Sequence, residues 1–246
     1  MRSVNETIAP RHFKWSFPPQ DLALSDDHVH VWVADLDQQE IHLKDFAKTL
    51  SSDEQKRASR FQFRQDRNHF VAARGLLRTI LSRYINLPAD NLEFSYGHNG
   101  KPSLVESLER SSLNFNLSHS GGLALYAVSQ NRELGIDLEK VSEFSDMDDI
   151  AARCFLEEEQ KALQFLAPEQ KAQNFFRHWT RKEAQLKCTG EGFSSAPENE
   201  IHFGDTLLEL EPAEQYIAAL AVRGKPFQLK TWQWQNDHLS RKLALP

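Results

Sequence analysis

The segment 135–140, Gly-Ile-Asp-Leu-Glu-Lys, alternates apolar and acidic residues and limits the fold more than any other part of the chain. Successive side chains of a β-strand point to opposite faces, so Ile136 and Leu138 predict one buried face. Asp137 and Glu139 then project together from the other face. Neighbouring carboxylates repel each other, and a hard cation such as Mg²⁺ between them relieves the repulsion. The alternative explanation is an acidic strand at the exposed edge of a sheet.

The composition is that of an ordinary globular protein. The chain has 246 residues, 40% hydrophobic and 26% charged, which is enough for one large domain or two small ones. Every hydrophobic run is interrupted, and residues 1–15 lack the apolar core of a signal peptide, so we expect a cytoplasmic protein with no membrane association. The net charge of −6 argues against a nucleic-acid partner. Cys154 and Cys188 have no metal-site spacing and are expected to pack in helices.

Residue spacing in the first part of the chain predicts both strands and helices. The predicted strands are 29–33, 92–96, 113–117 and 123–128. Ser51 and Glu54 form a capping box that begins a helix running toward Phe61. A longer helix is predicted over residues 66–84. Beside its apolar face lies a stripe of arginines: Arg67, Arg74 and Arg78. These arginines either extend along the surface or reach an anionic ligand.

Beyond residue 140 the pattern is helical and then β-rich. One helix is predicted to end near Phe155, and a long one is predicted from Pro168 to Gly190. Glu183 and Lys187 are four residues apart on the margin of the long helix's buried face, so they are neighbours, with an ordinary surface ion pair as the simplest explanation. The predicted strands that follow are 200–203, 216–222 and 227–235.

Two glycine-containing segments carry groups that bind phosphate. Gly100-Lys101-Pro102 places a lysine between a flexible and a rigid residue. The segment 118–122, Ser-His-Ser-Gly-Gly, offers hydroxyl, imidazole and backbone donors at the end of a predicted strand. This second segment could equally be a hairpin turn, because strand character resumes at Leu123. Neither segment is specific by itself.

Taken together and in order, four motifs resemble the Sfp-type 4′-phosphopantetheinyl transferases. The motifs are Gly-Lys-Pro at 100–102, Asn-Phe-Asn-Leu-Ser-His-Ser at 114–120, Gly-Ile-Asp-Leu-Glu at 135–139 and Trp-Thr-Arg-Lys-Glu-Ala-Gln-Leu-Lys at 179–187. The resemblance covers residues 50–193. Enzymes of that family transfer the 4′-phosphopantetheine arm of coenzyme A to a serine of an apo acyl or peptidyl carrier protein and release adenosine 3′,5′-bisphosphate.

The resemblance implies an α+β fold of two similar halves, each a small, mainly antiparallel sheet packed against a long helix. The active site would lie at their junction. The family has a short trimeric form and a double-length form, and 246 residues suit the latter, a monomer. The halves are expected at residues 1–133, with the coenzyme-binding loops, and 134–246, with the metal-binding carboxylates.

The resemblance also implies roles for individual residues. The implied ligands of Mg²⁺, or of Mn²⁺ in its place, are Asp137, Glu139 and Glu183. Either Glu183 or Glu139 would be the general base, and Lys187 would be a catalytic cation facing the pyrophosphate. The implied coenzyme contacts are Arg57, Lys101, Ser118, His119 and Lys187.

One position departs from the family pattern. Some relatives have a basic residue three positions before Arg57, where this chain has Glu54, so Arg60, Arg67 or Arg74 could replace that cation. A metal-dependent phosphodiesterase that uses the same carboxylates is the alternative function. A non-catalytic nucleotide-binding module is the third. The sequence does not indicate which carrier protein or pathway is served.

Overall fold

The computed structural model describes residues 13–105, 112–190 and 205–236. Its strands are β1 (His28–Asp35), β2 (Phe94–Tyr96), β3 (Pro102–Leu104), β4 (Leu113–Ser120), β5 (Leu123–Gln130), β6 (Leu134–Lys140), β7 (Thr206–Leu210), β8 (Tyr216–Val222) and β9 (Gln228–Gln233). Its α-helices are α1 (Glu40–Thr49), α2 (Ser52–Ala58), α3 (Arg64–Ile85), α4 (Met147–Cys154), α5 (Glu157–Gln164) and α6 (Pro168–Thr189). None of these helices combines the length and hydropathy needed to cross a bilayer.

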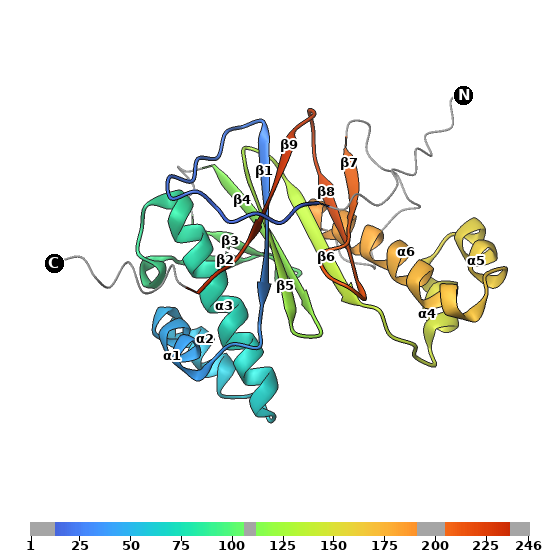
Figure 1. Cartoon of the computed structure of the whole chain (residues 1–246), viewed down its shortest axis with the longest axis horizontal. Helices are drawn as coiled ribbons and strands as arrows, with labels where there is room; N and C mark the ends of the chain where they lie inside the picture. The colour runs from blue at the N-terminus through green and yellow to red at the C-terminus, as the bar shows by residue number, and fades with distance from the viewer. Residues whose placement is uncertain (1–12, 106–111, 191–204, 237–246) are drawn as a thin grey trace.

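Two sheets occupy the centre of the molecule, and a long helix covers the outer face of each (Figure 1). The first sheet has the strand order β4-β5-β1-β9 and packs against α3. The second has the order β6-β8-β7 and packs against α6. Aliphatic side chains of β1 and β5 meet those of β6 and β8 between the sheets. The α+β fold of two sheets, each packed against a long helix, is therefore confirmed.

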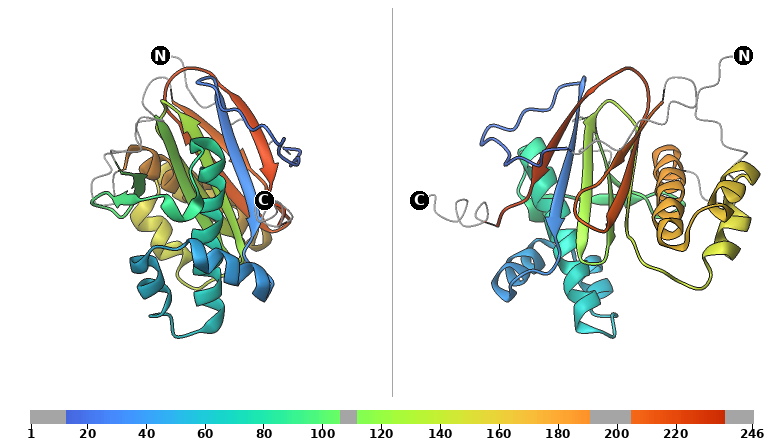
Figure 2. Two further views of the ribbon diagram at one scale, coloured as in Figure 1. Left: turned by 90° about the vertical axis from the view of Figure 1, so that its left-hand side faces the viewer. Right: turned by 45° about the vertical axis from the view of Figure 1, so that its right-hand side comes forward.

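Strand β9 lies in the first sheet although it comes from the second part of the chain. It runs parallel to β1, with Gln228 opposite His28 and Gln233 opposite Val33. The other pairings within the two sheets are antiparallel. The division into residues 1–133 and 134–246 stays a prediction, and this topology shows that the chain returns to the first sheet after it builds the second. Figure 2 shows β9 beside β1 from two further directions.

Most of the predicted elements are present, with shifted ends. The capping box at Ser51 is confirmed, because its side chain accepts from the Glu54 N–H while the Glu54 carboxylate accepts from the Ser51 N–H. The long helices α3 and α6 match their predictions, and α6 ends at Gly190 in the left-handed conformation. Strand β4 continues through Ser120, so the turn between β4 and β5 consists of Gly121 and Gly122 alone. Helix α1 and strand β7 were not predicted, and the predicted strand 200–203 lies outside the described residues.

Candidate active site

The acidic face of β6, which the alternation predicted, lies against α6. Ile136 and Leu138 are fully buried between the sheets, while Asp137 projects to the opposite side. Gly135 permits the close packing of α6, because a Cβ there would lie 2.1 Å from the Ala184 carbonyl oxygen and 2.3 Å from the Cys188 nitrogen. The absence of a side chain at this position therefore lets the last turns of α6 rest directly on β6.

Lys187 of α6 reaches the carboxylate of Asp137. Its Nζ donates to Asp137 Oδ1 at 2.6 Å and to the Ser118 hydroxyl at 3.2 Å. Ser118 in turn donates to the same Asp137 oxygen at 3.0 Å. The Asp137 side chain is only 4% exposed and that of Lys187 is 30% exposed, so the carboxylate of this pair is shielded from solvent while the lysine remains partly accessible. Three elements, β4, β6 and α6, thus meet at one carboxylate.

Glu139 is held from strand β4 by Ser120. The Ser120 hydroxyl donates to Glu139 Oε2 at 2.8 Å and accepts from the Lys140 N–H at 3.1 Å. Burial raises the pKa of Glu139 above its ordinary value; the Ser120 hydrogen bond and Lys187 oppose this, and the negative charges of Asp137 and Glu183 add to it. One hydroxyl group therefore fixes both the backbone and the carboxylate at this end of β6.

Glu183 belongs to the same charge cluster. Burial raises the pKa of Glu183, the ammonium group of Lys187 lowers it, and the charge of Asp137 raises it further. The negative charge of Asp137 therefore acts on both Glu139 and Glu183. Ser118 and Ser120 of β4 contact Asp137 and Glu139 of β6, and we call this region the β4–β6 seam.

The seam is also joined by Asn116, a residue of β4 for which the sequence predicted no role of its own. Asn116, 3% exposed, accepts a hydrogen bond from the Ile136 N–H at 2.9 Å. With Ser118 and Ser120 it forms a row at every second residue of β4, which faces the edge of β6. The alternation of polar residues from 114 to 120 could have predicted this row from the sequence. Polar side chains that lie inside a protein at the edge of a sheet are expected to pair with backbone N–H groups.

His119 lies near this cluster and near a second histidine. Although His119 is exposed as a whole residue, partial desolvation of its imidazole lowers the pKa, and the positive charges of Lys187 and His69 lower it further. His69, on α3, lies 2.7 Å from the Asp37 carboxylate. Sequence reasoning missed His69 because nothing in the helical pattern distinguishes it from a surface residue.

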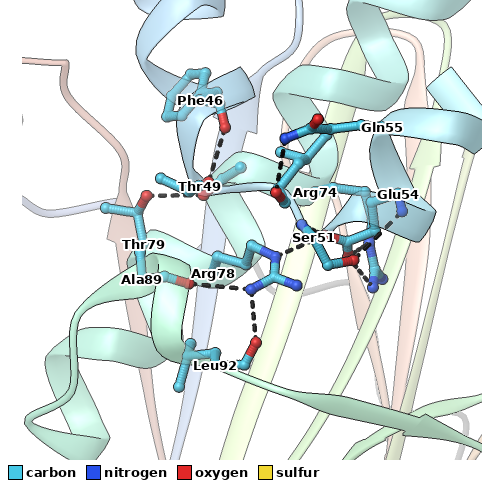
Figure 3. Close-up of polar contacts among 12 residues, drawn as sticks. Phe46, Thr49, Ser51, Glu54, Gln55, Arg74, Arg78, Thr79, Ala89 and Leu92 are labelled. Atoms are coloured by element: carbon cyan, nitrogen blue, oxygen red, sulfur yellow. Dashed lines mark hydrogen bonds and ion pairs between the residues drawn. The ribbon is translucent and has the colours of Figure 1, made fainter. Parts of the chain in front are cut away.

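The charged residues of α2 and α3 form a separate group (Figure 3). Glu54 is 5% exposed and accepts from Arg74 Nε at 2.8 Å and from Arg78 Nε at 2.7 Å. Arg78 also donates to the carbonyl oxygens of Leu92 and Ala89. Both explanations offered for these two arginines are therefore wrong, because the Glu54 carboxylate inside the protein is their partner.

Two of the predicted coenzyme contacts lie outside the carboxylate cluster. Arg57 is exposed, lies 5.3 Å from the centre of the Phe70 ring, and lines a hollow of about 620 Å³ with Lys56 and Arg60. Lys101 lies at the end of α6, where its Nζ is hydrogen-bonded to backbone carbonyl oxygens. From the predicted coenzyme-binding set, a hydrogen bond joins Ser118 and Lys187 at the seam. The charge of Lys187 also acts on His119, the residue next to Ser118 in β4.

The chemistry of the cluster suits a hard cation. It offers carboxylate oxygens, which Mg²⁺ prefers, and Asp137 Oδ2 is buried with no hydrogen-bond partner among the residues that the structure describes. In the arrangement of the described residues, however, no three His, Cys, Asp or Glu side chains converge closely enough to hold a metal ion. Lys187 lies on the Asp137 carboxylate, so a cation would compete with its ammonium group for that ligand.

Comparisons with known proteins agree with this architecture. The sequence model of the 4′-phosphopantetheinyl transferase superfamily matches residues 133–244, and that of the 4′-phosphopantetheinyl transferase N-terminal region matches residues 37–131. The chain is 44% identical over 232 residues to 4′-phosphopantetheinyl transferase HetI of Nostoc sp., across 89% of this chain and 98% of that protein. The chain therefore belongs to the 4′-phosphopantetheinyl transferase superfamily. It is an enzyme of the phosphopantetheinyl transferase class.

More distant relatives come from animals and from other bacteria. The L-aminoadipate-semialdehyde dehydrogenase-phosphopantetheinyl transferase of Xenopus laevis is 29% identical over 201 residues, which cover 77% of this chain and 65% of that protein. The 4′-phosphopantetheinyl transferase of Bacillus subtilis is 30% identical over 145 residues, which cover 59% of this chain and 62% of that protein.

Proposed function

We propose that this enzyme transfers the 4′-phosphopantetheine arm of coenzyme A to a serine of an apo acyl or peptidyl carrier protein. The observation that carries the proposal is the cluster at the β4–β6 seam, where Lys187 contacts Asp137 and Ser118 beside Glu139 and Glu183. Carboxylates and a lysine in one shielded site are suited to a reaction that moves a phosphoryl group and develops negative charge.

In the proposed reaction the carrier serine oxygen attacks the phosphorus that bears the pantetheine arm. A P–O bond forms to serine, the P–O bond within the pyrophosphate breaks, and adenosine 3′,5′-bisphosphate leaves. Glu183 or Glu139 accepts the serine proton; burial raises the pKa of both carboxyl groups, which makes them stronger bases than exposed glutamates. Lys187 neutralises the charge on the departing phosphate.

Asp137, Glu139 and Glu183 are the proposed ligands of Mg²⁺, or of Mn²⁺ in its place. The bound cation would supply charge neutralisation at the pyrophosphate. Ser118 and His119 are proposed to donate hydrogen bonds to the coenzyme phosphates from the end of β4. Arg57 is proposed to bind a phosphate of the nucleotide, which the hollow beside α2 would admit. The protein is further proposed to act as a cytoplasmic monomer.

The stoichiometry of coenzyme A consumption tests the proposed reaction. With Mg²⁺ and an apo carrier, the enzyme should release one adenosine 3′,5′-bisphosphate for each modified carrier, and none without the carrier, as measured by ion-pair chromatography. A phosphodiesterase would consume coenzyme A in the absence of the carrier, and that result would refute the transferase proposal.

A pair of variants assigns the reaction to the seam. Asp137→Asn keeps the shape of the side chain but removes its charge, so transfer should fall at least about a thousandfold. Glu143→Gln, an exposed control, should keep the wild-type rate. Full activity of Asp137→Asn with an intact circular dichroism spectrum would place the chemistry elsewhere. Because Glu183 and Glu139 are also proposed metal ligands, pH–rate profiles of Glu183→Gln and Glu139→Gln should identify the general base as the residue whose variant loses the rise in rate on the acid side.

A further inference from the structure

The loop between β2 and β3 contacts the end of α6, which lies far away in the sequence. The loop spans residues 97–101 and is closed by its own hydrogen bonds, from the Gly97 N–H to the Lys101 carbonyl at 3.0 Å and from the Gly100 N–H to the Gly97 carbonyl at 2.9 Å. The end of α6 carries Lys187 in its last turn. The turn of the separate two-stranded β2–β3 sheet thus contacts the helix that carries Lys187.

Two side chains of this loop donate to backbone carbonyl oxygens. Lys101 Nζ donates to the carbonyl of Lys187 at 2.5 Å and to those of Leu134 and Cys188 at 3.3 Å each. Asn99 Nδ2 donates to the Gly190 carbonyl at 2.9 Å. We call Lys101 and Asn99 the α6 clamp.

The contacts have a clear physical basis. The last four carbonyl groups of an α-helix lack intrahelical partners, and they carry the negative end of the helix dipole. A lysine at this position satisfies those carbonyls and complements the dipole. Burial lowers the pKa of Lys101, while Cys188 and Glu133 oppose that shift.

The number of donors distinguishes a clamp from a phosphate ligand. An ammonium group has three N–H donors, and Lys101 has three carbonyl acceptors within 3.3 Å. A phosphate bound by Lys101 would have to replace at least one of these bonds. The residue whose carbonyl lies closest is Lys187, and the Lys187 side chain contacts Asp137 at 2.6 Å. Lys187 therefore links the two groups: its carbonyl oxygen accepts from Lys101, and its side chain contacts Asp137.

We propose that Lys101, assisted by Asn99, is a positioning residue that fixes the last turn of α6 and so aligns Lys187 with Asp137. The proposal rests on the transferase function for its effect on catalysis, but the clamp itself is a property of the folded protein. It differs from the direct coenzyme contact that the family resemblance implies for Lys101.

Hydrogen–deuterium exchange tests the clamp without coenzyme, metal or turnover. Lys101→Met keeps most of the aliphatic stem and removes all three donors, and Asn99→Ala removes the neutral donor. Both should raise amide exchange about tenfold or more at residues 187–190, with α3 unchanged. Lys44→Met is the matched control, because that lysine is exposed and pairs only with Glu40 on its own helix among the described residues. It should leave exchange unaltered.

Steady-state kinetics then separate positioning from binding. Lys101→Met should lower kcat about tenfold and change KM for coenzyme A less than about twofold, since small misalignments reduce rate more than affinity. Asn99→Ala should act in the same direction with a smaller effect. Because Asn99 carries no charge, a fall in kcat for Asn99→Ala cannot be explained by the loss of a cation that binds phosphate.

Other combinations of results overturn the proposal. A rise in KM of tenfold with unchanged kcat and exchange would make Lys101 a direct coenzyme ligand. Faster exchange with unchanged kcat would remove the positioning role, and unchanged exchange would remove the clamp. If the wild-type enzyme modifies no carrier, the transferase function fails while the exchange result still decides whether the clamp exists.

Discussion

Gly135→Ala should uncouple α6 from β6. The new Cβ would lie 2.1 Å from the Ala184 carbonyl oxygen and 2.8 Å from the Lys187 carbonyl carbon, both backbone atoms of α6. Ordinary van der Waals contact begins at 3.4 Å, so strand and helix must separate by about 1.3 Å. No rotamer change can relieve the contact, because the atoms it meets belong to the helix backbone.

The expected magnitudes follow from this displacement. Overpacking of a buried contact costs about 1–3 kcal/mol, which lowers Tm by roughly 2–12 °C in a chain of this size. A shift of about 1 Å between Lys187 and Asp137 should lower kcat about a hundredfold. Activity should thus fall far more than the loss of folded protein explains, because the variant stays folded at assay temperature.

A second glycine provides the matched control. In Gly75→Ala the new Cβ would lie 2.3 Å from Phe46 Cβ, at the contact between α1 and α3 and away from the seam. Its Tm should fall by a similar amount, but kcat should stay within about threefold of the wild type. Differential scanning calorimetry and carrier modification at 25 °C measure the two effects. Equal kcat values for the two variants, or a wild-type kcat for Gly135→Ala, would refute the packing argument.

Three further predictions concern charge and hydrogen bonding. Glu54→Gln should lower the free energy of unfolding by about 3 kcal/mol or more near pH 7, because it leaves two buried arginines without a carboxylate. Burial alone would raise the pKa of Glu54, but Arg74 and Arg78 hold it below its ordinary value, so the stabilisation is present above the unfolded-state pKa and is lost as pH falls through the folded-state pKa. Thermal unfolding curves of variant and wild type should therefore converge in acid, and curves that stay apart would contradict the reasoning. Ser120→Ala should lower the transfer rate about tenfold and weaken Mn²⁺ binding, because it releases Glu139, whereas Ser120→Thr should keep the wild-type rate and affinity. Equal Mn²⁺ affinities of the two variants in isothermal titration would contradict the role of the hydroxyl. Lys187→Met should abolish most transfer yet tighten Mn²⁺ binding several-fold, since the competing ammonium group is gone, and weaker binding by electron paramagnetic resonance would contradict the competition.

The sequence predicted the parts of the site that follow from local pattern. Alternation from 135 to 140 correctly placed Asp137 opposite the buried face, and helical spacing put Glu183 beside Lys187. Local pattern does not determine which elements touch. The meeting of α6 with β6 was expected only through the family resemblance, and its physical cause, the missing side chain at Gly135, became visible in three dimensions.

The partners of buried charges were the hardest feature to predict. Arg74 and Arg78 looked like surface residues beside an apolar face, and only the docking of α2 on α3 brings Glu54 to them. No sequence pattern indicates the carbonyl partners of Lys101, because the nearest of them in the sequence is 33 positions away. Likewise, β9 could be predicted as a strand but not as a parallel neighbour of β1, because pairing between distant strands is set by tertiary packing.

The most direct test of the central claim is the intact mass of an apo carrier protein after incubation with coenzyme A, Mg²⁺ and the enzyme. The carrier should gain the mass of one phosphopantetheine group on its serine with the wild type, and less than about 1% of the carrier should gain it with Asp137→Asn over the time in which the wild type just completes the reaction. An unmodified carrier with folded wild-type enzyme across a panel of acyl and peptidyl carriers would contradict the proposed function. Full modification by the Asp137→Asn variant would contradict the role assigned to the β4–β6 seam.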